Sequence, residues 1–278
     1  MLTHILMVHC DDERGLIFRI TNVINKHNLN IVSNDEFVER SMSRFFMRTE
    51  FSGEFNKENF LAELETLLPK DAKVKLVENR KRDIVILATK EYHCLGHLLL
   101  RHQFNDLNAN ILAVISNYSN LEELTSRFGV PFYCVDHTGV SREEHEEEIL
   151  KILGKYEPEF IVLAKYMRVL TPKLVTPYNN RIINIHHSFL PAFIGANPYL
   201  QAFERGVKII GATAHFVNNE LDEGPIISQN VIPVNHSYDA KEMARTGKDV
   251  ERIVLADALR LVCEERVFVY KNRTIILN

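Results

Sequence analysis

The chain has no tryptophan, only four cysteines, and no apolar run long enough to cross a membrane. Its longest apolar runs, Ile84 to Ala88 and Ile161 to Ala164, fall far short of the roughly 18 residues that a spanning helix needs. The amino terminus lacks a basic region followed by an apolar core, which a secretory signal would require. We therefore expect a soluble, unexported protein with no membrane partner.

The cysteines also lack the spacing of a disulfide framework or a metal site. Cys10, Cys94, Cys134 and Cys263 are scattered in mainly apolar surroundings, and no CxxC pair occurs. This distribution is typical of free thiols in a reducing compartment, and we expect the cytoplasm.

Neither sign of charge is in large excess. The 33 basic and 37 acidic residues give a net charge of -4, which offers no electrostatic reason for a nucleic acid partner. The length of 278 residues and the hydrophobic content of 46% allow two domains with cores of their own. The one basic cluster, Asn79 to Arg82, is interpreted as a solvated linker between them.

The first 79 residues show the pattern β-α-β-β-α-β of a ferredoxin-like domain. Alternating or apolar runs indicate strands, and apolar positions at helical spacing indicate helices. The expected elements are a strand at 4–8, a helix at 16–27, a hairpin of 30–38 with 44–51, a helix at 57–68 and a strand at 73–77.

Residues 80–83 are expected to link this domain to a second one that spans 84–278. Its first strand, 83–88, is continuously apolar, as in a parallel sheet that helices cover on both faces. Helices expected at 94–103, 121–128 and 142–155 alternate with strands at 111–116, 132–135 and 160–163. The alternation predicts an α/β fold with a doubly wound, mostly parallel sheet. A helix over 240–262 is expected to be interrupted near Gly247, and a hairpin is expected to close the chain.

Candidate catalytic side chains follow a buried strand and a loop in the second domain. The run Ile182-Ile183 leads into Asn184 and His186, whose side chains share one face because strand residues two apart do so. Asp222 lies in a loop with Gly224-Pro225, directly after an extended run that contains His215. An amide, an imidazole and a carboxylate suit chemistry at a carbonyl group. Ser188 lies nearby, but no GxSxG turn exposes it as a nucleophile, and a hydrogen bond capping the loop is expected instead.

Two kinds of site are not supported by the sequence. The turn from Ala88 to Gly96 is not the Gly-rich type that brings several backbone N–H groups onto a phosphate. His93 and His97 lie four residues apart, but no further ligands for a metal are evident, so no metal is expected.

Three motifs carry a resemblance to a known family. Residues 184–191 read Asn-Ile-His-x-Ser-x-Leu-Pro, residues 211–217 Gly-Ala-Thr-x-His-x-Val, and residues 221–225 Leu-Asp-x-Gly-Pro. Together they resemble the transformylases and hydrolases that use formyltetrahydrofolate. The resemblance implies that Asn184, His186 and Asp222 are the catalytic residues and that 10-formyltetrahydrofolate is the substrate, with no further cofactor.

Within this family, His187 and the segment 189–198 are similar to the branch that transfers the formyl group to water. This implies hydrolysis to formate and tetrahydrofolate, in one-carbon metabolism and purine biosynthesis. The resemblance also implies that the pterin of the folate lies against Met167, Arg168, Val169 and Leu170, and the loop that begins with Val217 and Asn218 and runs to Asp222 is expected to close its other side. His215 is expected to belong to the catalytic network or to lie beside the substrate, because its strand should run towards the pocket. Without the resemblance, Met167 and Leu170 would be interpreted as core residues before a helix at Pro172.

The first domain resembles an ACT domain, through its first strand, the Asp-x-x-Gly-Leu turn at 12–16 and the start of the second strand at Asn30-Ile31. This resemblance implies a homo-oligomer through the ACT-like sheets and an amino acid effector near Asp11, Arg14 and Gly15, where helix N–H groups can accept a carboxylate. The alternative is that Gly15 only permits the turn and the domain only oligomerises.

Other functions stay open at this point. A transferase acting on an unphosphorylated amine would share every catalytic residue, and an inactive sensor of folate and amino acids would share the fold. A formyltransferase acting on transfer RNA is disfavoured by the charge balance.

Overall fold

The computed structural model describes residues 2–192 and 197–277, and the chain divides into two compact units. The first unit contains the residues up to Arg80 together with Glu264–Phe268 and the chain end from Ile275. The second contains Lys81–Cys263 and Val269–Thr274. Each unit is described by itself.

The first unit has the predicted ferredoxin-like order. Its antiparallel sheet has the strand order β2-β3-β1-β4. The elements are β1 (Thr3–Asp11), α1 (Leu16–Lys26), β2 (Asn30–Glu39), the 3-10 turn η1 (Arg40–Met42), β3 (Arg44–Ser52), α2 (Lys57–Leu67) and β4 (Lys73–Glu78). Gly15 precedes α1 with φ 88°, a left-handed conformation that favours glycine.

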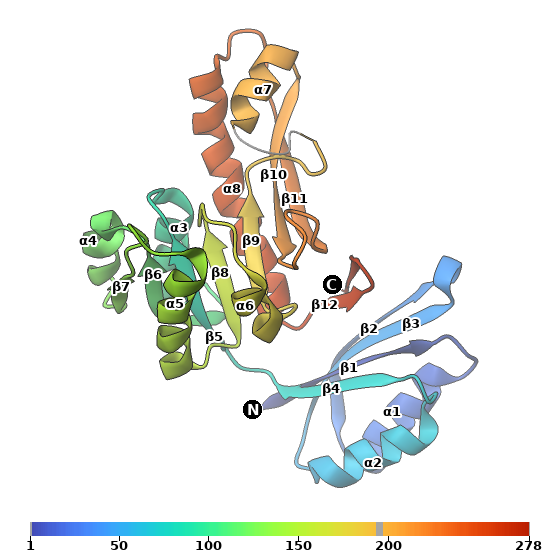
Figure 1. The fold of residues 1–278 in the computed structure, drawn as a ribbon. Helices are drawn as coiled ribbons and strands as arrows, with labels where there is room; N and C mark the ends of the chain where they lie inside the picture. The colour runs from blue at the N-terminus through green and yellow to red at the C-terminus, as the bar shows by residue number, and fades with distance from the viewer. Residues whose placement is uncertain (1, 193–196, 278) are drawn as a thin grey trace. The chain divides into compact units, whose positions relative to one another are not determined.

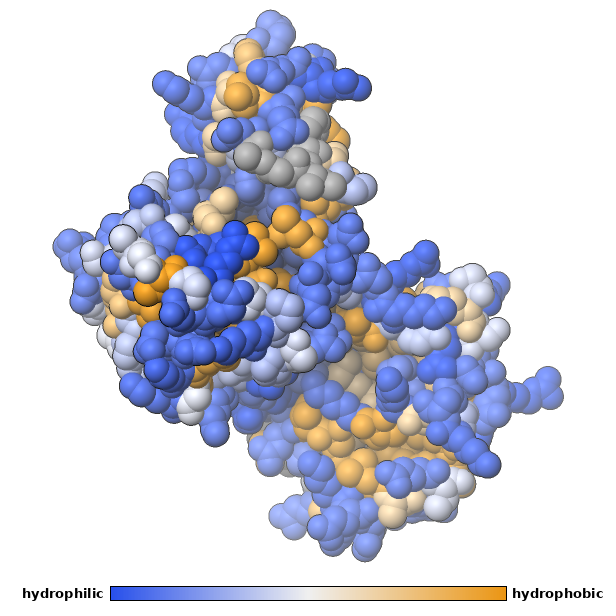
Figure 2. Space-filling view, viewed as in Figure 1, coloured by the Kyte–Doolittle hydropathy of each residue, from blue (hydrophilic) through white to orange (hydrophobic). Residues whose placement is uncertain are grey.

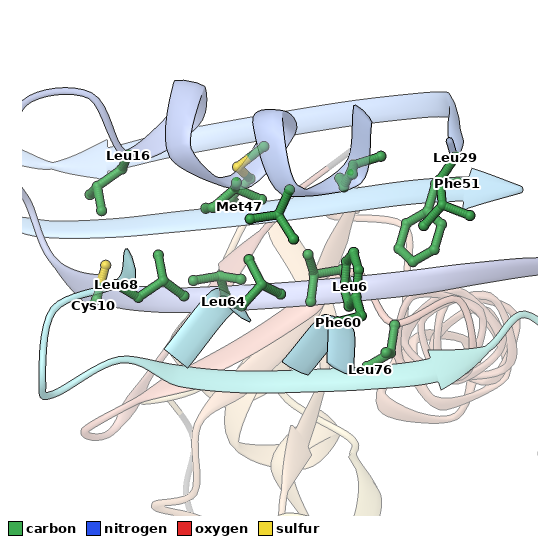
Figure 3. Close-up of a cluster of buried hydrophobic side chains, with 14 of the residues drawn as sticks. Leu6, Cys10, Leu16, Leu29, Met47, Phe51, Phe60, Leu64, Leu68 and Leu76 are labelled. Carbon is green, nitrogen blue, oxygen red and sulfur yellow. The ribbon is translucent and has the colours of Figure 1, made fainter. Parts of the chain in front are cut away.

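The core of this unit lies between the sheet and its two helices (Figure 3). The helices contribute buried side chains at helical spacing, and the strands contribute alternate residues of one face. The cluster includes Leu16, Ile20, Val23 and Ile24 from α1, Phe60 and Leu64 from α2, and Leu6, Val8, Phe45, Met47 and Phe51 from the strands.

The other face of this sheet receives part of the chain end. Phe268 lies 5.5 Å from the ring of Phe46, centroid to centroid. The Arg48 guanidinium donates to the carbonyl oxygens of Glu264 and Glu265. These contacts explain why residues 264–268 belong to the first unit although they follow the second in the sequence.

The second unit is built on a seven-stranded sheet in the order β11-β10-β9-β8-β5-β6-β7 (Figure 1). The strands from β9 to β7 in this order run parallel, and β10 and β11 are antiparallel to their neighbours, so the doubly wound, mostly parallel sheet is confirmed. The strands are β5 (Arg82–Ala88), β6 (Ala109–Ser116), β7 (Phe132–Cys134), β8 (Phe160–Ala164), β9 (Ile182–His186), β10 (Ile209–Phe216) and β11 (Ile226–Pro233).

Helices cover both faces of this sheet. Buried residues of α5 and α6 meet alternate strand residues such as Val85 and Leu87, whereas α8 packs against β10 and β11. The helices are α3 (His93–Gln103), α4 (Glu122–Ser126), α5 (Arg142–Tyr156), α6 (Pro172–Val175), α7 (Pro198–Arg205) and α8 (Ala240–Cys263), with 3-10 turns η2 (Ser119–Leu121) and η3 (Thr176–Tyr178). A separate two-stranded sheet pairs β12 (Val267–Tyr270) with β13 (Arg273–Ile276).

The expected interruption of α8 near Gly247 is wrong, because the helix continues from Ala240 to Cys263. A Cβ atom at Gly247 would lie 2.1 Å from the Tyr199 hydroxyl oxygen. Glycine is therefore needed here for a close approach of α7 to α8 and does not mark a break in the helix.

Over the described residues, no helix combines the length and the apolar character that crossing a bilayer requires. Figure 2 shows hydrophilic residues over most of the viewed face, with apolar residues confined to smaller areas.

Candidate active site

Two neighbouring strands of the second unit position three of the candidate side chains. Asn184 and His186 are the third and the last residue of β9. In the neighbouring antiparallel strand β10, His215 lies opposite Asn184, and Thr213 lies opposite His186. Because side chains directly opposite each other in an antiparallel pair share a face, His215 is brought beside Asn184. The strand ends at His186, where the parallel strands of an open α/β sheet usually bind ligands.

The loop between β10 and β11 brings Asp222 to the same place. Asp222 has a φ of 58°, and Gly224 lies so close to β10 that a Cβ atom would be 1.7 Å from the Phe216 carbonyl oxygen. The Phe216 amide donates to the Pro225 carbonyl at 2.9 Å. The Gly-Pro pair therefore allows the loop to fold back onto β10, and this fold brings the Asp222 carboxylate beside the end of β9.

The distances confirm that these side chains form one cluster. His186 Nδ1 lies 3.3 Å from Asp222 Oδ1, and His215 Nε2 lies 3.8 Å from the same oxygen. Asn184 Nδ2 lies 3.2 Å from His215 Nε2. His186 Nε2 is buried and has no hydrogen-bond partner within the part of the chain that is described, so it is available to a bound molecule.

The charges of the cluster follow from its contacts. The hydrogen bond from His186 lowers the pKa of Asp222 and outweighs burial, so the carboxylate is ionised at neutral pH. Burial lowers the pKa of His215, so this ring is neutral. Its Nδ1–H donates to the Phe216 carbonyl at 2.8 Å, which leaves Nε2 as an acceptor.

The His215 tautomer, with its proton on Nδ1, fixes the orientation of the Asn184 amide. An acceptor at His215 Nε2 requires a donor, so the NH₂ group of Asn184 faces His215. One N–H of Asn184 is used in this contact, and the second is free to donate to a substrate. His215 is therefore a positioning residue for Asn184.

We expect the His215→Phe variant to lose about tenfold in kcat with little change in KM, because one orienting hydrogen bond contributes roughly 0.5–1.5 kcal/mol. Steady-state kinetics and thermal unfolding would be measured together. In the Asn184→Ala background, the same change should cost almost nothing further, since there is no amide left to orient. A full additional tenfold loss in the double variant would contradict the positioning role.

The cluster lines a cavity of about 880 Å³ in the second unit. All the residues expected to contact the folate line it: Met167, Arg168, Val169, Leu170, His215, Val217 and Asn218. The loop after β8 that carries four of them is anchored at both ends, since the Met167 amide donates to Thr89 Oγ1 at 3.0 Å and the Thr171 amide donates to buried Glu146 at 2.7 Å. The loop therefore forms a fixed wall of the cavity.

The cavity also contains polar residues that sequence reasoning did not assign to the site. His93, Lys165, Tyr199 and Glu251 line it, and the first three each contact the Glu251 carboxylate. One signal was present for Glu251, which occupies a buried position of the amphipathic helix α8, between Val250 and Val254, where an unpaired acid would be unfavourable.

Three further sequence predictions concern Ser188, the segment 189–198 and the turn after β1. Ser188 Oγ donates to the Ala192 carbonyl at 2.8 Å, as expected for a residue that caps the loop. Phe193 to Ala196, part of the segment similar to the hydrolase branch, lie outside the described residues. In the first unit, Asp11 forms an ion pair of 2.6 Å with buried Arg44 at the end of β1, whereas the Arg14 side chain is exposed.

Comparison with known proteins assigns both units. A model of the formyl transferase family matches residues 82–259, and a model of the ACT domain matches residues 4–68. A formyltetrahydrofolate deformylase from Haemophilus influenzae is 54% identical over 273 residues, which cover 98% of each chain. The chain belongs to the formyltetrahydrofolate deformylase family. The combination of an ACT domain with a formyltransferase domain, expected from the sequence, is confirmed.

Solved structures agree with this family assignment. A crystal structure of the deformylase from Pseudomonas syringae has a TM-score of 0.95 and 36% identity, and the match covers 100% of this chain and 95% of that one. A glycinamide ribonucleotide transformylase from Symbiobacterium toebii has a TM-score of 0.68 and 32% identity over 71% of this chain and 94% of its own. The deformylase family thus shares a domain with glycinamide ribonucleotide transformylases.

Proposed function

We propose that the cavity of the second unit hydrolyses 10-formyltetrahydrofolate to formate and tetrahydrofolate, with Asn184, His186 and Asp222 as catalytic residues. The activity is the one for which the family is named. The observation that supports the assignment of residues is their convergence on one cavity. An oriented amide, an ionised carboxylate and an imidazole whose Nε2 has no partner among the described residues all face it.

In the first step, a water molecule attacks the formyl carbon, and the π electrons of the carbonyl group move to its oxygen. The free N–H of Asn184 and a proton on His186 Nε2 donate to this developing oxyanion. Because His186 Nδ1–H already faces Asp222, this step uses the doubly protonated ring, whose charge the Asp222 carboxylate balances. Asp222, which is ionised, orients the water and accepts its proton. Both donors are held in place before substrate binds, so little reorganisation is needed during the reaction.

In the second step, the tetrahedral intermediate collapses and the bond from carbon to N10 breaks. The proton taken up by Asp222 returns, directly or through His186, to N10 as it leaves with the bonding electrons. The products are tetrahydrofolate and formic acid, which ionises at neutral pH and releases one proton. This chemistry is supplied by side chains of the chain itself, and we propose that it uses no metal and no cofactor besides the folate.

The folate is proposed to lie between the two loops that line the cavity. Met167 to Leu170 on one loop and Val217 with Asn218 on the other offer apolar side chains and backbone polar groups to a flat heterocycle. Met167 and Val169 are exposed on this wall, where they offer apolar contact area to a ligand between polar groups of the cavity.

The test is formate release from 10-formyltetrahydrofolate by the purified protein in a buffer without amines. Catalytic release in this buffer supports water as the acceptor. Folate binding without release of formate would favour the inactive sensor, and release that depends on an added amine would favour a transferase.

For the first unit, we propose that it joins copies of the chain and binds an amino acid where the turn from Asp11 to Gly15 meets a neighbouring copy. Strand β2 is an edge of its sheet and exposes Ile31, Val32 and Phe37, as expected for a surface that a second copy covers. Gly15 opens α1, whose N–H groups suit a carboxylate.

We expect an oligomer with an even number of chains by light scattering, and a heat of binding for at least one member of a panel of amino acids. The Arg14→Ala variant should weaken this binding while leaving the oligomer intact, because the Arg14 side chain is exposed beside the turn. A monomer, or a panel that gives neither heat nor any change in formate release, would contradict the proposal.

The compartment is proposed to be the cytoplasm. The four cysteines are not joined in disulfides, and three of them are buried, as expected where thiols stay reduced.

A further inference from the structure

A second buried polar cluster faces the cavity and takes no part in the proposed chemistry. Its centre is Glu251 of α8, of which only 1% is exposed. Three groups from three other segments contact the carboxylate: His93 Nε2 at 2.8 Å, the Tyr199 hydroxyl at 2.6 Å and Lys165 Nζ at 3.3 Å. Glu251 therefore joins α8 to the start of α3, to the loop after β8 and to α7.

The carboxylate is ionised in this setting. Burial by itself raises the pKa of Glu251, but the hydrogen bond from His93, the charge of Lys165 and the hydrogen bond from Tyr199 lower it to about 2. Burial and the nearby carboxylate raise the pKa of Tyr199, so its phenol keeps its proton and donates it to Glu251. The cluster is thus a closed arrangement of one carboxylate with its donors.

The fold makes room for this arrangement. Gly247 precedes Glu251 by one helical turn, and any side chain there would overlap the Tyr199 ring. Glycine inside a helix costs roughly 0.5–1 kcal/mol relative to alanine. The close approach that it allows lets the Tyr199 hydroxyl reach Glu251.

A metal ion is not needed to explain the cluster. His93, Cys94 and Glu251 offer ligand atoms within 4.8 Å of one another. However, Lys165 already supplies positive charge to the carboxylate, and burial raises the pKa of the Cys94 thiol, which disfavours the thiolate that a metal requires.

A neighbouring ion pair extends the same wall of the cavity. Lys248, one turn before Glu251, lies 2.7 Å from the carboxylate of Glu91, and both residues line the cavity. Glu91 also lies 3.6 Å from His93 Nδ1. Lys165 and Lys248, the two lysines that contact this cluster, are therefore each matched by a carboxylate of the protein.

We propose that Glu251 and the neighbouring Glu91 determine specificity. Their carboxylates pair with the two lysines with which this wall would otherwise bind a second, anionic substrate. The inference rests on the proposed function, because it explains why water and not a phosphorylated amine accepts the formyl group. The transformylase that shares the fold is named for a ribonucleotide, which carries a phosphate. In this chain, a phosphate would have to compete with Glu251 and Glu91 for the two lysines.

The proposal predicts that removing the Glu251 charge creates an anion site. Inorganic phosphate would be titrated calorimetrically into the full-length protein without folate. We expect the Glu251→Gln variant to bind phosphate about tenfold or more tightly than the unaltered protein, because Lys165 then lacks its counter-ion. Glu251→Asp, which keeps the charge, should not gain binding, and Glu251→Gln with Lys165→Met should lose what Glu251→Gln gained.

A folded Glu251→Gln variant that binds phosphate no better than the unaltered protein would overturn the proposal. Should this variant fail to fold, Glu91→Gln is measured in its place, because it removes the counter-ion of Lys248 at a partly exposed position. Tighter phosphate binding by this variant supports the proposal, and equal binding overturns it. Calorimetry needs no turnover, so its result stands apart from the assay of formate release that tests the proposed function.

Discussion

The Asp222→Asn variant is expected to release formate about 10³-fold more slowly than the unaltered protein, within the roughly 10²–10⁴-fold range of general acid and base catalysis. Asparagine keeps the shape of the side chain but neither accepts the proton of water nor carries negative charge beside His186. The measurement is kcat for formate release at saturating 10-formyltetrahydrofolate.

The pH dependence of this deficit follows from the contacts of Asp222. The hydrogen bond from His186 lowers the pKa of Asp222, so the carboxylate is fully ionised across the neutral range and its loss costs the same at pH 6 and pH 8. Folate binding, measured separately, should change little and serves as the control. Turnover within threefold of the unaltered protein would remove Asp222 from the catalytic set.

The Asn184→Ala variant is expected to lose roughly 10²–10³ in kcat, the usual cost of one preorganised oxyanion donor. The lost interaction exists only when charge develops on the formyl oxygen, so KM should stay nearly constant. Steady-state kinetics with the matched substitution Asn219→Ala, at a residue that lines the same cavity and has no role in the proposed chemistry, separates this effect from a general disturbance of the pocket.

An equal loss in both variants would contradict the role given to Asn184, because Asn219 has no part in oxyanion stabilisation. Thermal unfolding of both variants serves as the folding control. Asn184 is half-buried at the end of β9, so its truncation should leave the sheet intact.

The arrangement of Asn184, His186 and Asp222 could be anticipated because each signal is local. A polar pair two residues apart at the end of an apolar strand has a defined geometry, and a Gly-Pro loop marks the place of the carboxylate. The position of His215 beside Asn184 could not be derived in the same way, because it depends on the antiparallel register between β9 and β10.

The Glu251 cluster was missed for a physical reason. Two of its members, His93 and Glu251, are 158 residues apart in the sequence, and no local pattern joins them. The apolar spacing predicts an interruption near Gly247, where intrinsic propensity also disfavours a helix, but the packing of Tyr199 against α8 overrides both signals. Contacts between distant segments thus decide what the sequence pattern leaves open.

The most direct test of the account is a single turnover of 10-formyltetrahydrofolate in water enriched in ¹⁸O, with mass spectrometry of the released formate. Attack by water at the formyl carbon predicts one ¹⁸O atom in each formate, and loss of nearly all labelled product in the Asp222→Asn variant under the same conditions. Recovery of the formyl group on an amine with no labelled formate would contradict the account, as would undiminished labelled product from the variant.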